Sequence, residues 1–369
     1  MRHTFIIENL KLVEMKKENK INFAGSLSCP IPKSDYEKIL LAHGGGGTLS
    51  HKLISKLFYP QFANDILAQQ HDSGIFEINK IKFAFTTDSY VVQPIFFPGG
   101  DIGSLAVNGT VNDLSMAGAK PLFISAAFIL EEGFDIEDLW KIVLSMQKAA
   151  EESGVQIITG DTKVVDKGKG DKIFINTSGI GVVPEGVNIS PKNCKPGDVI
   201  ILSGKIAEHG IAIMSSRENL EFDTFIKSDT APLNSLVEIM LDASKEISMM
   251  RDPTRGGIAS TLNEIAMTAK VGILIEEEKI PIAEEVKGAC EILGLDPLYI
   301  ANEGKLIAFV SNSGANKVLE VMRSHALGKE ARIIGKVTSS DPGTVIMKTC
   351  IGSNRIVDMM SGEQLPRIC

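Results

Sequence analysis

The sequence lacks the cysteine patterns of secreted and zinc-binding proteins. Its five cysteines are scattered, and no two of them form a CxxC pair. A disulfide framework or a structural zinc site needs closer and more regular spacing. We therefore expect reduced thiols. The five residues are Cys29, Cys194, Cys290, Cys350 and Cys369.

Long hydrophobic runs and an excess of basic charge are also absent. No apolar stretch reaches the roughly 20 residues of a membrane-spanning helix. The first 20 residues mix lysines with acids and do not resemble a secretory signal. The 38 basic residues are outnumbered by 46 acidic ones, and the resulting charge of −8 argues against a general nucleic-acid surface. We expect a cytoplasmic protein that binds neither membranes nor nucleic acid.

The chain is long enough for two globular domains. Its 369 residues are 44% hydrophobic and 23% charged, a composition typical of soluble proteins, and one small core does not accommodate this length. A segment rich in Pro, Gly and Asn over 184–198 is typical of a domain boundary. We predict an extension over 1–38, a first domain over 39–186, a second domain over 187–351 and a tail over 352–369.

Both predicted domains mix helices and strands, so the predicted fold class is α/β. In the first domain, strand-like segments alternate with a helical pattern that ends at Gly154, a common residue at helix C-termini. The second domain repeats this mixture. Strands are predicted at 82–92, 121–130, 155–160, 172–183, 199–204, 305–310 and 331–339, and helices at 135–154, 235–247 and 256–270.

Four aspartates stand where these elements are expected to end. Asp88 and Asp161 follow apolar strands, Asp113 lies in GTVNDLSMAGAKP, and Asp252 precedes the glycines of RDPTRGG. Loops after strands commonly bind ligands in α/β proteins, and carboxylates there suit magnesium held together with phosphate oxygens. The alternative is that each aspartate is a helix cap or a turn residue. Together the four favour a site for magnesium and a polyphosphate.

A run of glycines precedes a helical pattern in HGGGGTLSHKLISKLF. Gly44 to Gly47 could bring backbone amides close to a phosphate at the start of that helix. A glycine run is more often a flexible connector. By itself this run is therefore a weak indication of phosphate binding.

A few polar residues have both a chemical and an ordinary interpretation. Lys163 could neutralise charge that develops during phosphoryl transfer, or it could be a solvated surface lysine. Glu303 in IANEGKL could act as a base or form part of a turn. We interpret His43, His51 and His209 as surface or capping residues, because they form no recognised metal-binding pair.

Cys369 is the last residue of the sequence and follows a proline-containing segment. A thiol in this position contributes little to a core. Prenylation of the usual kind requires three residues after the cysteine, and none follow. Apart from an incidental cysteine, the remaining interpretation is a thiol that serves chemistry on a mobile tail.

The chain resembles the HypE family of hydrogenase maturation factors in a whole series of motifs. The likeness runs from about Leu41 to Cys369, and the extension over 1–38, of undetermined role, departs from the family. The motifs are AHGGGG, FTTDSY, FFPGGDIG, NGTVNDLSMAGAKP, FILEEG, ITGDTKVV, DKIFINTSGIG, RDPTRGG, ANEGKL, SHALGKEA and the terminal PRIC.

This resemblance implies a fold, a reaction and partners. The fold is that of the aminoimidazole ribonucleotide synthetase (PurM-like) superfamily, with ATP between two α/β domains and first-domain sheets that close a barrel across a homodimer. In the family, the carbamoyltransferase HypF loads a carbamoyl group onto the terminal cysteine, and ATP-dependent dehydration converts it into a thiocyanate. The cyanide then passes to a HypC–HypD scaffold complex, which builds the Fe(CN)2CO centre of nickel–iron hydrogenase.

The resemblance also implies residue roles. Cys369 would carry the carbamoyl group, Glu303 would be the base, and Lys163 would stabilise charge. Removal of the Cys369 thiol is expected to spare ATP binding. Asp88, Asp113, Asp161 and Asp252 would hold Mg²⁺ and ATP, and the further ATP-binding residues would be Gly44, Gly45, Gly46, Gly47, Asn112, Thr162, Gly256 and Gly257.

Two other functions remain open at the level of sequence. One is another ATP-using enzyme on the same scaffold, such as an amidine-forming purine enzyme, a thiamine-phosphate kinase or a selenophosphate synthetase. Those reactions need no terminal thiol, and selenium activation would favour Cys or selenocysteine where this chain has His43. The other is a non-catalytic scaffold, which would bind its partners without turning over ATP.

Overall fold

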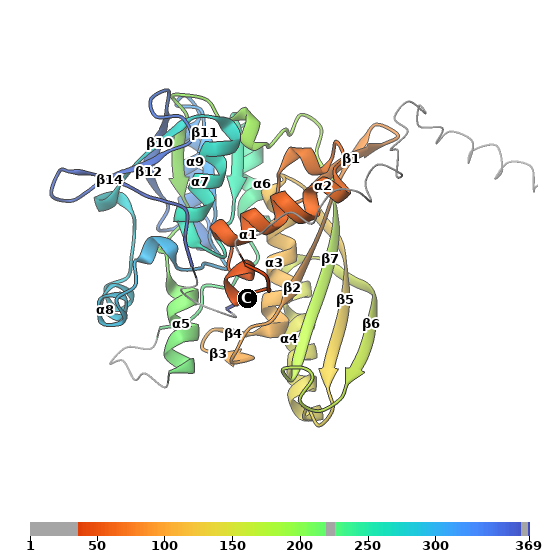
Figure 1. Ribbon diagram of the computed structural model, residues 1–369. Coiled ribbons are helices and arrows are strands. Elements are labelled where there is room, and N and C mark those ends of the chain that lie inside the picture. The colour runs from red at the N-terminus through yellow and green to blue at the C-terminus, as the bar shows by residue number, and fades with distance from the viewer. Residues whose placement is uncertain (1–35, 219–225, 363–367) are drawn as a thin grey trace, which may run out of the picture. The chain divides into compact units, whose positions relative to one another are not determined.

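The computed structural model describes residues 36–218, 226–362 and 368–369 (Figure 1). The chain separates into a unit over Met1–Ile39 and a unit over Leu40–Cys369, and the architecture that follows belongs to the second unit. Nearly all of the predicted extension, with Cys29, lies outside the described residues. Within the described ranges, no helix has both the length and the apolar character required to cross a membrane.

The first half is built on a five-stranded sheet in the order β1-β2-β7-β5-β6. The pairs are antiparallel except for β5 and β6, which run parallel. Along β7 buried side chains alternate with half-buried ones, so one face of the sheet is covered and the other is open. The strands are β1 (Gly74–Ile78), β2 (Ile81–Tyr90), β5 (Lys120–Glu131), β6 (Gln156–Val165) and β7 (Ile173–Val183).

Two helices, α3 (Ile102–Met116) and α4 (Ile136–Ser153), cover one face of this sheet (Figure 1). The Asp101 side chain caps α3 by accepting hydrogen bonds from the amides of Gly103 and Ser104. Helix α4 ends as predicted at Gly154, whose φ of 69° is a left-handed conformation that favours glycine. Because α3 is buried along almost its whole length, it fixes the position of every polar residue it carries.

Shorter elements precede and connect these. The helical pattern after the glycines is confirmed, and Gly47 is its N-terminal cap. These elements are η3 (Leu41–Gly44), α1 (Thr48–Leu53), η4 (Ile54–Phe58), α2 (Tyr59–Phe62), η5 (Leu67–Gln69), β3 (Phe96–Phe97) and β4 (Gly100–Asp101).

The second half is built on a seven-stranded sheet in the order β14-β13-β10-β12-β8-β11-β9. All residues of β8 and β11 are buried, so these strands lie inside the core. The strands are β8 (Val199–Leu202), β9 (Ile247–Arg251), β10 (Gly272–Glu276), β11 (Ile307–Val310), β12 (Arg332–Thr338), β13 (Val345–Lys348) and β14 (Asn354–Ile356). The helical elements are η6 (Pro191–Asn193), α5 (Glu208–Arg217), α6 (Asn234–Ala243), α7 (Gly257–Ala269), η7 (Glu277–Lys279), α8 (Glu284–Leu293), η8 (Pro297–Tyr299), α9 (Ala315–Ser324) and η9 (Ala326–Gly328).

The structure differs from the sequence-based expectation in two places. The helix predicted over 235–247 ends at Ala243, because Ser244 adopts an extended conformation and the next apolar residues form the edge strand β9. The tail predicted over 352–369 is partly packed, since β14 pairs with β13 and Val357 and Met360 are buried.

The two halves share a core where the end of α3 meets the second sheet. Leu114 and Met116 belong to the same buried cluster as residues of β8 and β9, and α3 also contacts α6. The C-terminal end of α3 therefore lies at the junction of the two halves. Polar residues on this last turn can therefore meet residues of the second half.

We expect Phe309→Ala to lower the free energy of unfolding by about 3–5 kcal/mol, because it opens a cavity at the fully buried strand β11. The Phe309 side chain is 0% exposed. Ile351→Ala is the matched control, since Ile351 is 90% exposed and its truncation should cost under about 0.5 kcal/mol. Urea denaturation followed by circular dichroism measures both values. Equal losses would contradict the assignment of β11 to the core.

Candidate active site

Three aspartates meet at the junction of the two halves. Asp72 lies just before β1, Asp113 lies in the last turn of α3, and Asp252 follows β9 directly. One carboxylate oxygen from each lies within 4.8 Å of the other two. Elements from both halves therefore bring together a group that is scattered over 180 residues of sequence (Asp72 to Asp252).

The charges in this cluster oppose one another. Burial, followed by Asp72, raises the pKa of Asp252 to about 7. Burial, followed by Asp252 and Asp72, raises the pKa of Asp113 well above its usual range. Arg251 relieves part of this repulsion, since its Nε lies 2.6 Å from Asp72 Oδ1. Asp72 Oδ2 has no hydrogen-bond partner.

These observations match the donor set of a hard divalent cation. Magnesium prefers carboxylate oxygens and uses one or two of them together with phosphate oxygens. A cation would relieve the repulsion that raises these pKa values, and the unpartnered oxygen of Asp72 could coordinate it. Asp72, Asp113 and Asp252 therefore fit Mg²⁺.

Glu303 lies beside this cluster and is held from several sides. Its backbone N–H donates to Asp229 Oδ1 at 3.1 Å, and its backbone carbonyl accepts from Asn112 Nδ2 at 3.2 Å. Its side chain is 3% exposed, and its Oε1 has no partner. Burial, with Asp252 next, raises the pKa of Glu303 well above its usual range. A buried carboxyl group with a raised pKa and an unpartnered oxygen is suited to proton transfer.

The last residue of the chain reaches the same place. Burial raises the pKa of the Cys369 thiol to about 12, which Arg255 opposes while Glu303 and Asp88 add to it. In return, Cys369 is the main cause of a raised pKa at Arg255. These mutual influences mean that the thiol lies among Arg255, Glu303 and Asp88. In this structure the Cys369 thiol therefore lies inside the site.

The glycine run packs against the elements that bring the tail in. Arg255 donates through Nη1 to the carbonyl of Gly44 at 3.1 Å, and the amide of Thr48 donates to the carbonyl of Met360 at 2.9 Å. Gly46 has a φ of 75° and lies so close to Arg255 that an added Cβ would be 2.7 Å from that residue's Cβ. Gly47 approaches Met360 more closely still. The glycines thus permit close backbone contact beside the site.

Asp161 and Lys163 lie away from this site in space. They sit on the edge strand β6, which β5 and β7 separate from β2, so Asp161 is roughly 14 Å from Asp88 along the sheet. The register also aligns Asp161 with Ala127, and Ala127 with Asn176, on the open face. Lys163 Nζ pairs with Asp161 at 2.6 Å, and both side chains are exposed. Thr162 lies between them.

Asp88 belongs to the opposite face of the sheet. It pairs with Thr177, whose hydroxyl lies 2.6 Å from that of Thr110 on α3. A single chain therefore gathers Asp88, Asp113 and Asp252 of the predicted magnesium ligands and leaves Asp161 outside. Asp88 and Asp161 lie within strands, so the expectation that all four aspartates stand at element ends is wrong for these two. It is correct for Asp113, in the last turn of α3, and for Asp252, directly after β9.

Sequence reasoning missed several residues of this site. Asp72 in HDSG looks like a turn residue, and it follows no predicted strand, so the criterion applied to the other aspartates does not select it. Arg255 lies within RDPTRGG and could have been singled out there. The interpretation of His209 as a surface or capping residue is wrong, because its side chain is 0% exposed. His43 does cap, since its Nδ1 accepts from the amide of Leu40.

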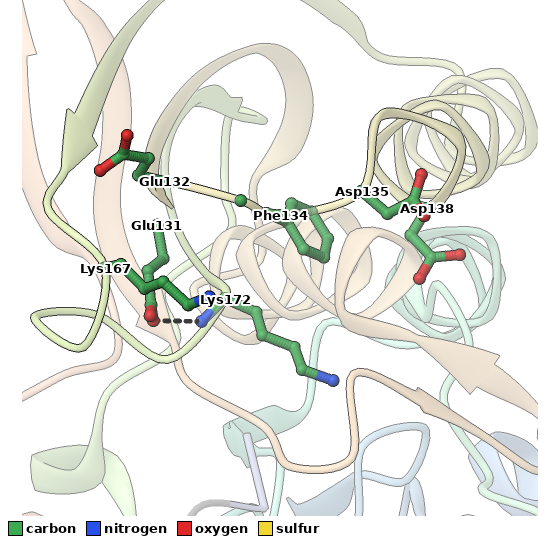
Figure 2. A pocket seen from close by; sticks show the side chains of 8 residues that line it. Glu131, Glu132, Phe134, Asp135, Asp138, Lys167 and Lys172 are labelled. Atoms are coloured by element: carbon green, nitrogen blue, oxygen red, sulfur yellow. Dashed lines mark hydrogen bonds between the residues drawn. The ribbon is translucent and has the colours of Figure 1, made fainter.

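The loops at the far ends of β5 and β6 line a separate pocket that shares no residue with this site. Figure 2 shows Glu131 hydrogen-bonded there to the backbone amide of Lys172, and the amide of Gly168 also donates to it. These two amides lower the pKa of Glu131. The role of Glu131 is to join two loops. The pocket is lined by Glu131, Glu132, Gly133, Phe134, Asp135, Asp138, Lys167 and Lys172.

Known proteins resemble this chain in both sequence and fold. The AIR synthase related protein N-terminal domain model matches residues 70–183, and the corresponding C-terminal domain model matches residues 195–348. The predicted boundary at 186 lies between these ranges. Carbamoyl dehydratase HypE of Rhizobium leguminosarum bv. viciae is 54% identical over 333 residues, which cover 90% of this chain and 95% of that protein.

Two solved structures resemble this one closely. A HypE–HypF complex contains a chain with a TM-score of 0.80 and 54% identity, covering 84% of this chain and 99% of that one. A HypE structure in complex with ATP has a TM-score of 0.77 and 48% identity, covering 90% of this chain and 100% of that one. The predicted mixed α/β fold related to AIR synthase is confirmed.

Substitution of Asp72 should weaken magnesium binding. We expect Asp72→Asn to raise the Kd for Mg²⁺ by at least roughly tenfold, since losing even a residue that only supports a metal ligand costs that much. Isothermal titration measures the affinity. Asp341→Asn is the matched control, because Asp341 is exposed and its φ of 50° is one that asparagine tolerates. Unchanged affinity in Asp72→Asn would exclude Asp72 from the metal site.

Proposed function

The chain belongs to the HypE family of carbamoyl dehydratases, and we propose that it uses ATP to dehydrate a carbamoyl group carried on the Cys369 thiol. The product is a thiocyanate on the same sulfur, which supplies the cyanide ligands of the nickel–iron hydrogenase Fe(CN)2CO centre. The observation that carries this proposal is the position of Cys369 beside Glu303 and Arg255, next to the aspartate cluster.

The reaction must turn a poor leaving group into a good one. The carbamoyl oxygen attacks the γ-phosphorus of ATP, and the bond to ADP breaks. The nitrogen then loses its two protons while the carbon–oxygen bond breaks and phosphate departs. Carbon, nitrogen and sulfur remain as S–C≡N, so the carbamoyl group loses the elements of one water and ATP becomes ADP and phosphate. A base beside the nitrogen and positive charge beside the phosphate are required.

The residues around the thiol suit these tasks. Glu303 is buried, carries an unpartnered oxygen and is oriented through its backbone, so we assign it the removal of protons from nitrogen. Arg255 would hold negative charge near the sulfur. Asn112 uses its amide donors on Glu303 and Ala231, so its role is to position the base. Magnesium, held by the aspartate cluster, would neutralise the phosphate oxygens of ATP.

The same proposal assigns ATP to the space between the halves. Two glycine segments border this space, Gly44 to Gly47 and the pair Gly256 and Gly257. Gly46 packs against Arg255. Gly47 is the N-cap of α1, and Gly256 is the N-cap of α7. Exposed amides at helix starts suit phosphate oxygens. The solved HypE complex with ATP supports nucleotide binding by this family.

We further propose a homodimer in which the open sheet face is covered by a second copy. Phe85, Ile180 and Phe123 form a cross-strand row on that face, and the two phenylalanines are 48% and 39% exposed. Asp161 and Lys163 lie on the same face. In a dimer that pairs these faces into a barrel, Lys163 would serve the site of the partner rather than that of its own chain.

Partners follow from the chemistry of the carrier thiol. The solved HypE–HypF complex supports HypF as the enzyme that loads Cys369. A HypC–HypD complex is the proposed acceptor of the cyanide. The structure has free thiols at Cys194, Cys290, Cys350 and Cys369. Free thiols are consistent with the proposed location in the reducing cytoplasm.

Intact-protein mass spectrometry tests the reaction. After incubation with HypF, carbamoyl phosphate and Mg-ATP, we expect the native chain to gain a carbamoyl group on Cys369 and then lose the mass of one water. Glu303→Gln should keep the carbamoyl adduct, and Cys369→Ala should gain none while still binding ATP. A native chain that gains no adduct from active HypF would favour a scaffold or another ATP-using relative.

Mixed dimers test the position of Lys163. Lys163→Ala and Glu303→Gln should each be inactive alone. When the two chains are mixed, one site in each mixed dimer would combine an intact Glu303 with an intact Lys163 from the partner. We expect about a quarter of native activity after random exchange, because half of the dimers are mixed and each has one complete site of two. No recovery, despite exchange seen by native mass spectrometry, would mean that Lys163 acts within its own chain.

A further inference from the structure

Hydrogen bonds to backbone carbonyls hold the last two residues in the site. The amide of Val91 donates to the carbonyl of Cys369 at 3.0 Å, and Nε2 of His209 lies 2.6 Å from the carbonyl oxygen of Ile368. The Ile368 side chain is buried in the core of the first half. Since both bonds involve the main chain, a group added to the sulfur leaves them available.

The surroundings of His209 fix it as a hydrogen-bond donor to the tail. A carbonyl oxygen can only accept, so Nε2 carries the hydrogen. Nδ1 of the neutral ring then accepts from the hydroxyl of Ser228 at 2.8 Å, and that hydroxyl oxygen accepts from the amide of Thr230 at 3.1 Å. Burial lowers the pKa of His209 and favours this neutral ring. Phe97 packs edge-on against it, with ring centroids 5.6 Å apart.

The segment that orients His209 also orients the base. Asp229 follows Ser228 and accepts from the amide of Glu303 at 3.1 Å and from that of Gly304 at 3.4 Å. Asn112 of α3 ties the same segment down by accepting from the amide of Leu233 at 2.8 Å. One short stretch, 228–233, therefore sets the position of both the tail contact and Glu303.

We propose that His209 is a positioning residue that seats the C-terminal tail, by donating from Nε2 to the Ile368 carbonyl, so that the loaded sulfur returns to one place beside Glu303. This role rests on the proposed function, in which Cys369 leaves the site to be loaded and comes back. The thiol itself then need not contribute to the affinity of the tail for the site. A loaded and an unloaded tail would be recognised through the same backbone bond.

A pair of substitutions separates this role from simple packing. His209→Gln places an amide N–H near the position of Nε2 and keeps the reach to Ile368. His209→Asn places its amide near the position of Nδ1 and loses that reach. Both variants remove the imidazole ring from the same buried position, so a purely structural role would make them similarly defective. Ser228→Ala keeps the ring and removes only the hydroxyl that fixes its tautomer.

The first measurement needs neither partner nor nucleotide. Full-length native and variant chains are treated with N-ethylmaleimide, and labelling of Cys369 is followed on its peptide, with the exposed Cys350 as internal reference. Amide hydrogen exchange of Val91 reports the neighbouring tail bond. We expect His209→Asn to speed both by roughly three- to tenfold, the effect of losing one hydrogen bond. His209→Gln should stay near native, and Ser228→Ala should fall between them.

Dehydration of the carbamoylated chain gives a second, independent readout. In single turnovers at saturating ATP, His209→Asn should slow loss of water by a similar factor without changing the Kd for ATP. Equal labelling and exchange in native, His209→Asn and His209→Gln chains would overturn the role of His209. If His209→Asn does not fold, equal rates in native and Ser228→Ala chains would overturn it. Contrasting labelling without any dehydration in the native chain would instead contradict the proposed function and leave the seating role intact.

Discussion

Buried carboxyl groups at the junction of the two halves govern the organisation of this protein. Burial raises the pKa values of Asp113, Asp252 and Glu303, and the charge of Asp252 adds to this effect at Asp113 and Glu303. Burial of like charges opposes folding unless other groups compensate. Arg251 offsets part of that cost at Asp72. The arrangement is therefore a site suited to positive charge, and magnesium bound together with a nucleotide would supply the missing partner.

The tail is bound in this acidic environment through its backbone. Val91 and His209 hold the carbonyls of the last two residues, while Arg255 lies near the sulfur and contacts the glycine run through Gly44. Under the proposed function, these backbone contacts would remain available whatever group the sulfur carries. Burial also raises the pKa of the Cys369 thiol. Under the proposed function, loading would therefore take place with the tail outside the site, because the thiolate is the nucleophile.

The open face of the first sheet explains why one chain leaves part of the predicted site apart. Asp161 and Lys163 face away from α3, on the same open face as the apolar row of Phe85, Ile180 and Phe123. A partner covering this face would bury apolar surface and use the exposed lysine at the same time. Catalysis and assembly would then depend on the same face of the sheet.

The sequence by itself determined the elements and the chemistry of their residues. Alternation along 172–183 and the helical pattern over 135–154 indicated β7 and α4. The resemblance to the HypE family, through motifs that include Glu303 and Cys369, implied an ATP-dependent reaction on a thiol. Tertiary structure decided which residues meet. A shift of one residue moves a strand's side chain to the other face, so the strand pattern alone did not separate Asp161 from Asp88. Asp72 joined the cluster, and His209 met Ile368, only through contacts between segments far apart in the chain.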